Sequence, residues 1–170
     1  MSIVSRVMMF ANSAVIGFGQ GFQPVCSFNY GAGKYDRVKK AFWFCVKTCF
    51  VFLVIVSVVS VVKAEFIIDL FSRGDTAVTK IGAMAFRMQC LTMPLNAFIV
   101  LANMMTQTIR LPIQASIIAA SRQGLLFIPA VLIGGRLFAL YGIMAAQPIS
   151  DIGTLIISIV IVSGVLKKLK

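Results

Sequence analysis

Amide side chains within an apolar stretch are the first residues of this sequence that suggest chemistry. Gln20 and Gln23 lie in the segment GFGQGFQP, which ends at Pro24. A proline frees a backbone carbonyl about a turn upstream, and freed carbonyls together with amides can line a cavity that coordinates a cation or a drug. Glycines that only pack helices, with amides bonding across them, explain the pattern equally well. Both interpretations stay open, with Gln20 and Gln23 as candidate binding residues and Pro24 as a candidate conformational element.

A second set of amides lies later in the chain. Gln89, Asn96, Asn103 and Gln107 are separated by seven, seven and four residues. Residues seven apart on a helix drift by only about 20°, so the four share roughly one face, which Pro94 would kink in the middle. Such a stripe predicts either a lumen or a seam between helices. We therefore add Asn96, Asn103 and Gln107 as candidate binding residues and Pro94 as a second conformational element.

Other chemistry finds little support in the sequence. The chain has no histidine, which excludes a Ser-His-Asp triad, a Cys-His dyad and zinc sites with histidine ligands. The Gly-x-Gly-x-Gly run lacks the preceding strand and the Lys-Ser/Thr pair of nucleotide-binding loops. Cys45 and Cys49 share a helix face, but packing explains them better than a metal site. We expect no enzymatic activity, no catalytic residues, no metal and no bound cofactor.

The composition indicates the kind of protein in which these amides lie. The 170 residues are 59% hydrophobic and 12% charged, whereas ordinary soluble domains are about 45–50% apolar and about 25% charged. Sixteen basic residues against five acidic ones give a net charge of +11. The basic residues form small groups between apolar stretches, as in polytopic membrane proteins, and this spacing argues against nucleic acid as a partner.

Five apolar stretches have the length of membrane spans. The clearest is Ala41–Val62, which as a helix would reach about 33 Å across a hydrocarbon core of about 30 Å. In lipid the backbone must satisfy its own hydrogen bonds, so a helix is expected despite the many β-branched residues. The sequence therefore predicts an all-α membrane helix bundle in contact with lipid, with spans at residues 3–28, 41–62, 78–109, 113–133 and 149–166.

Basic residues also predict an orientation. Counting Lys and Arg outside the spans and at their edges gives nine on one side and five on the other. The more basic side should be cytoplasmic, which puts the C-terminus inside and the N-terminus outside. Arg122 counts on the cytoplasmic side, as a side chain at the inner interface. All five acids are expected in connections or at span edges, so no span centre would carry a carboxylate to couple Na⁺ or H⁺.

Several motifs, in order, resemble the multidrug and toxic compound extrusion (MATE) family. Gly19–Val25, Asn29–Gly33 and Arg37-Val38 are similar to the end of that family's eighth helix and the loop after it. Weaker similarities follow in a Pro-containing helix, in a short break where the family often has Gly-Lys-Pro, and in a later Ser-Arg-Gln-Gly segment. These lie at Arg87 and Pro94, at Gln107 with Arg110-x-Pro112, and at Ser121–Gly124 with Pro129.

The resemblance implies a fold and a function. Family members have twelve helices in two lobes and export cationic, amphipathic compounds in exchange for Na⁺ or H⁺. The five spans would be helices eight to twelve, so residues 1–170 would form a partial C-terminal lobe in the plasma membrane, with a missing N-terminal lobe as partner. Some branches carry an acid in the tenth helix, where this chain has Asn96. A non-transporting truncated subunit or remnant, and a relative of lipid-linked-sugar flippases, remain alternatives.

Overall fold

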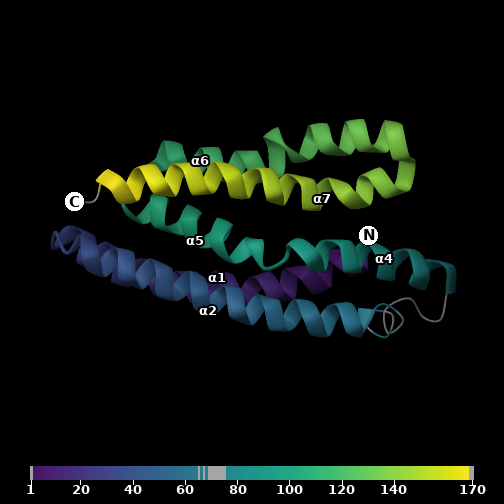
Figure 1. Ribbon diagram of the computed structural model, residues 1–170, viewed down its shortest axis with the longest axis horizontal. Helices are drawn as coiled ribbons and strands as arrows, with labels where there is room; N and C mark the ends of the chain where they lie inside the picture. The colour runs from purple at the N-terminus through teal and green to yellow at the C-terminus, as the bar shows by residue number, and fades with distance from the viewer. Residues whose placement is uncertain (1, 65, 67, 69–75, 169–170) are drawn as a thin grey trace.

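The computed structural model describes residues 2–64, 66, 68 and 76–168, and over these residues the fold is a helix bundle (Figure 1). The predicted all-α fold is therefore confirmed for the described part of the chain. The π-helical turn η1 connects α6 to α7. In chain order the elements are α1 (Ser2–Gly31), α2 (Tyr35–Val62), α4 (Thr76–Thr92), α5 (Leu95–Thr108), α6 (Pro112–Ala120), η1 (Ser121–Leu125) and α7 (Phe127–Lys168).

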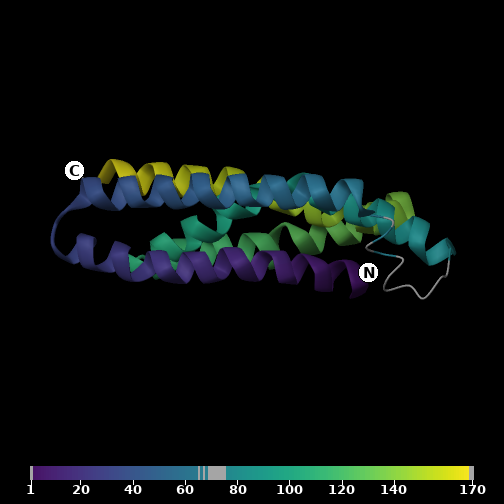
Figure 2. The same ribbon diagram turned by 90° about the horizontal axis from the view of Figure 1, so that it is seen from below.

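The helices run lengthwise along the long axis of the molecule (Figures 1 and 2). Helix α7 folds back on itself, so its first part continues the line of α6 and η1 and its second part returns beside them (Figure 1). Gly134 and Gly142 allow the two parts to meet: a Cβ on Gly134 would lie 2.8 Å from the carbonyl oxygen of Gly142. We refer to this fold-back as the α7 hairpin.

Apolar side chains occupy both the inside and the outside of the bundle. Phe42, Leu53 and Phe86 are fully buried, whereas Phe10 and Leu91 are 84% and 75% exposed. An outer surface of this kind is expected where lipid, rather than water, surrounds a helix bundle.

Three helical segments are long and apolar enough to cross a membrane, and the bent pair α4–α5 raises the number to four, among the described residues. The three are Tyr35–Val62, Pro112–Arg136 and Ala145–Lys167, and the bent pair is Gly82–Thr92 with Leu95–Thr108. These overlap four of the five predicted spans, and the crossing by α1 remains a prediction. The last segment begins at Ala145 rather than at residue 149, which moves Asp151 about two turns inside it.

Breaks between helices follow the turn chemistry of the sequence. Helices α4 and α5 meet at an angle of 54°, at the break before Leu95 that Pro94 predicts. In the described part of the chain two residues adopt the left-handed conformation: Gly33, at φ 68° between α1 and α2, and Arg110, at φ 59° between α5 and α6. Pro24, by contrast, lies inside α1 without ending it.

Candidate ligand pocket

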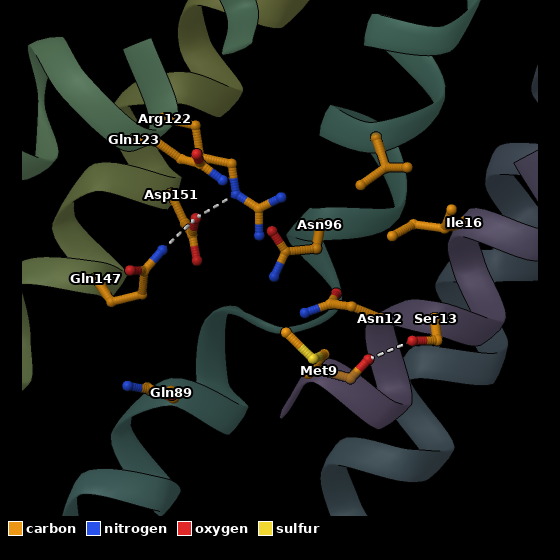
Figure 3. Close-up of a pocket in the computed structure, with 11 residues that line it drawn as sticks. Met9, Asn12, Ser13, Ile16, Gln89, Asn96, Arg122, Gln123, Gln147 and Asp151 are labelled. Atoms are coloured by element: carbon orange, nitrogen blue, oxygen red, sulfur yellow. Dashed lines mark hydrogen bonds and ion pairs between the residues drawn. The ribbon is translucent and has the colours of Figure 1, made fainter. Parts of the chain in front are cut away.

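A polar cavity of about 340 Å³ opens between α1, α4, α5, η1 and α7 (Figure 3). Eight of its eleven lining side chains carry an amide, a guanidinium, a carboxylate or a hydroxyl group. We call this cavity the polar pocket, and it is lined by Met9, Asn12, Ser13, Ile16, Gln89, Asn96, Val100, Arg122, Gln123, Gln147 and Asp151.

An ion pair forms one wall of the polar pocket. Arg122 Nε lies 3.3 Å from Asp151 Oδ1, and Gln147 Nε2 donates a hydrogen bond to the same oxygen at 3.3 Å. The Asp151 side chain is only 4% exposed, whereas that of Arg122 is 23% exposed and reaches the cavity (Figure 3). A buried carboxylate needs such partners because an isolated charge away from water is costly.

Two expectations about these charges are therefore wrong. Arg122 lies about midway along the candidate span Pro112–Arg136 and pairs inside the bundle instead of reaching outward to the inner interface. Asp151 is likewise not at a span edge but inside the segment Ala145–Lys167. The pairing explains both placements, because each side chain supplies the counter-charge that makes the other tolerable away from water.

The π-helical turn η1 gives Arg122 its position. Leu126 N–H donates to the carbonyl oxygen of Ser121 at 3.1 Å, five residues back instead of four. Ser150 Oγ on α7 donates to the carbonyl oxygen of Arg122 at 2.7 Å. Neighbouring residues Ser150 and Asp151 thus hold the backbone and the side chain of Arg122 at once. π-Turns of this type occur frequently at functional sites.

Two amide oxygens in the polar pocket have no hydrogen-bond donor. Asn96 is 5% exposed, and its Oδ1 is buried without a partner, as is Oδ1 of Asn12. Asn12 comes from α1 and Asn96 from the start of α5, and both side chains lie at the cavity in Figure 3. Buried acceptors are normally satisfied, so this pair indicates a place for a ligand that donates hydrogen bonds.

The structure separates the predicted binding residues. Asn96 lines the polar pocket together with Gln89 from the same predicted stripe. Asn103 and Gln107 do not line it and instead bond to each other, with Gln107 Nε2 donating to Asn103 Oδ1 at 3.3 Å. They lie two to three turns further along α5, away from the break at Pro94.

Gln20 and Gln23 also lie outside the polar pocket. Gln20 is exposed and Gln23 is half-buried, both on the part of α1 beyond the pocket. Their glycine-rich segment borders a second, apolar cavity of about 460 Å³ between α1 and α2, which we call the apolar groove. Its lining residues are Gly17, Phe18, Gly21, Phe22, Val25, Ala41, Phe44 and Cys45.

Seven residues of the polar pocket with polar or charged side chains were not among the predicted binding residues: Asn12, Ser13, Gln89, Arg122, Gln123, Gln147 and Asp151. The useful signal was the pair of opposite charges, since Arg122 and Asp151 are the only charged residues of their two predicted spans. Among the described residues no group of three or more His, Cys, Asp or Glu side chains could hold a metal.

Solved transporters share the fold of this chain. It superposes on an inward-facing multidrug resistance MATE family transporter (TM-score 0.91), on the Vibrio cholerae MATE transporter VcmN in the bent form (0.91), and on a MATE protein in complex with MaL6 (0.93). Sequence identity is 16% in each case. The matches cover 98–99% of this chain but only 38–39% of the solved chains, so it spans well under half of their length.

Sequence comparison gives the family. No curated protein sequence matches the chain. A sequence model of the MatE family, however, matches residues 1–133, more than half of the chain. The chain therefore belongs to the MatE family, in agreement with the motifs of its first helix and with its fold.

Proposed function

We propose that this chain forms part of a multidrug-type efflux transporter that exports small cationic, amphipathic compounds by exchange for Na⁺ or H⁺. The polar pocket is the observation that carries the proposal. It places unpartnered acceptors and a charged pair in a cavity within an otherwise apolar membrane bundle. Polar groups are expensive in such a place, and a substrate pathway is the usual reason for them.

The arrangement of the bundle supports the transport role. Helices α4 and α5 form a broken span, and Gln89 and Asn96 reach the polar pocket from either side of the 54° break. Broken helices at a binding site are a recurring feature of transporters, where the break can change angle during the transport cycle. Pro94 is therefore the residue we assign to the conformational change, with Pro24 of α1 as a second candidate.

Membrane placement and partners belong to the same proposal. We place the chain in the plasma membrane with its C-terminus in the cytoplasm, as the basic residues predict. The chain spans 38–39% of the solved transporters, which supports a second lobe as the partner that completes the substrate path. Lipid and small cationic substrates are the remaining partners, and the coupling ion would bind only transiently.

Dye efflux tests the proposal. The protein, expressed from its own gene in cells without other efflux pumps, should lower the accumulation of a cationic dye. Asn96→Ala should reduce efflux about tenfold, because a hydrogen bond to a charged ligand contributes about 1.5–3 kcal/mol. Asn103→Ala is the matched control on the same helix and should leave efflux within about twofold, the size of a change of about 0.5 kcal/mol.

Two results would contradict the proposal. Wild-type cells that accumulate dye as fast as empty cells would favour a non-transporting subunit. Equal efflux by wild type and Asn96→Ala, at equal expression, would remove the polar pocket from the substrate path. Expression of the 170 residues alone shows whether they are sufficient for transport.

A further inference from the structure

The polar pocket has a single acid and a single base among its described lining residues, and they are already paired with each other. Asp151 is the only carboxylate there that could attract a cationic ligand. Its Oδ1 already accepts from Arg122 and from Gln147. A cation that enters the pocket therefore meets no uncompensated negative charge while Arg122 holds its position.

The contact between Arg122 and Asp151 is suited to exchange. At 3.3 Å it is longer than charge-assisted N–H···O bonds, which are about 2.7–2.9 Å in their strong form. The guanidinium is also the more exposed member of the pair, and both side chains line the cavity (Figure 3). An entering group can thus approach the carboxylate as Arg122 withdraws.

The surrounding groups favour an organic ammonium ion as the entering group. Asn12 Oδ1 and Asn96 Oδ1 are acceptors without donors at the same cavity. An ammonium group has several N–H donors and could satisfy these two oxygens as well as Asp151. The apolar side chains of Met9, Ile16 and Val100 offer contact to the rest of an amphipathic molecule.

The π-turn supplies the means for Arg122 to withdraw. A π-turn contains one residue more than an α-helical turn of the same span, so its conversion to α-helix rotates the residues beside it. In this structure Ser150 Oγ holds the Arg122 carbonyl at 2.7 Å and so stabilises the π form. The position of the guanidinium is therefore coupled to one hydroxyl group on α7.

We propose that Arg122 acts as a built-in cation that competes with ammonium ligands for Asp151, and that Ser150 and the π-turn hold it in the blocking position. The proposal rests on the proposed function only for the cationic class of ligand. Binding of an ammonium group to Asp151 would release Arg122, and the guanidinium would return to Asp151 when the ligand leaves. Arg122 thus sets the affinity of the pocket for cations and helps to expel them.

The test measures binding of two fluorescent probes to the detergent-purified protein expressed from its own gene. Dansylcadaverine carries a primary ammonium group, and N-butyl dansylamide is a neutral analogue. Arg122→Gln should bind dansylcadaverine about fivefold more tightly, the lower end of ordinary coupling between sites, and should leave the neutral probe unchanged. The gain should vanish in the double variant Arg122→Gln with Asp151→Asn.

A second pair of variants covers the case in which Arg122→Gln does not fold. Ser150→Ala keeps every charge and should raise dansylcadaverine affinity about twofold, at the weak end of modulation by residues outside the contact. Thr154→Val is the matched control, because Thr154 donates to the carbonyl oxygen of Ser150 at 2.8 Å within the same helix. It should leave both affinities unchanged.

Unchanged or weaker dansylcadaverine binding by Arg122→Gln and by Ser150→Ala would overturn the inference. A gain shared by the neutral probe would do the same, because it would show a larger pocket instead of a released charge. If either of these binding results is found while cells show normal dye efflux, the inference about Arg122 is rejected and the proposed function stands. Absent efflux together with tighter binding by Arg122→Gln rejects the proposed function alone.

Discussion

The polar pocket and the apolar groove lie on opposite faces of one helix. At about 100° per residue, Asn12 and Ile16 point to one side of α1, and Phe18 and Val25 point to the other. The groove is built from two helices that follow each other in the chain, α1 and α2. The pocket needs side chains from five elements, and its ion pair joins residues 29 positions apart.

The difference shows that local sequence motifs and ligand chemistry are in different places. The segment GFGQGFQP marks the family but borders a cavity with apolar walls, where Gly17 and Gly21 leave open space beside the helix. The pocket with charge and unpartnered acceptors has no compact motif. The following substitutions act on one of the two regions or, in the last case, on neither.

The largest effect is expected at the ion pair. Asp151→Ala leaves Arg122 without its partner inside the bundle and should destabilise the protein by about 3–5 kcal/mol, the usual result of removing one member of a buried pair. Thermal unfolding in detergent would show the loss as a lower Tm. Arg122→Gln with Asp151→Asn removes both charges and should recover much of the stability.

If the double variant were as unstable as Asp151→Ala, the loss of stability would not come from an unpaired Arg122. Ser13→Ala is a suitable control, because its hydroxyl bonds to the carbonyl oxygen of Met9 on its own helix at 2.8 Å and belongs to no ion pair.

Glycine substitutions distinguish the α7 hairpin from the apolar groove. Gly142→Ala directs a Cβ into the backbone of Gly134 and should cost about 1–3 kcal/mol, as overpacking does. Because the hairpin returns the chain to Asp151, probe binding at the polar pocket should weaken as well. Gly17→Ala meets no atom within 4 Å and should be neutral or slightly stabilising. Tm and probe binding measure both effects, and equal Tm values for the two variants would contradict the close approach in the hairpin.

The smallest effect is expected at the turn between α5 and α6, which lies outside both cavities. Arg110 has a φ of 59°, a left-handed conformation that favours glycine. Arg110→Gly should therefore stabilise the protein by about 1 kcal/mol and raise the Tm. Arg110→Ala keeps the strain and serves as the control. A lower Tm for Arg110→Gly than for Arg110→Ala would show that the turn is not strained.

The sequence was sufficient to predict the helices and most of their breaks. Long apolar runs with few charged residues indicate membrane-spanning helices. Pro94 and Pro112 mark breaks because proline lacks the N–H that a helix interior needs. Asn96 was predicted as a binding residue and does line the polar pocket. It could be found because an unexplained amide in a spanning helix is itself a signal.

The ion pair was harder to predict for a physical reason. A charge near the end of an apolar run can either extend to an interface or pair within the bundle, and only the partner's position decides. The predicted start of the last span at residue 149 placed Asp151 at an edge, whereas the helix extends back through the hairpin. Asn103 and Gln107 lie on the same helix as Asn96, but two to three turns beyond it and outside the pocket. Their side chains form a hydrogen bond with each other instead.

Protection of single cysteines by substrate tests most directly whether the polar pocket, rather than the apolar groove, is the binding site. The four native cysteines are buried and would be replaced by alanine. Single cysteines would then be introduced at Gln123 in the pocket or at Phe44 in the groove, both of which are exposed. Our account predicts that dansylcadaverine slows maleimide labelling at position 123 and not at position 44. Protection at position 44 with none at position 123 would contradict it.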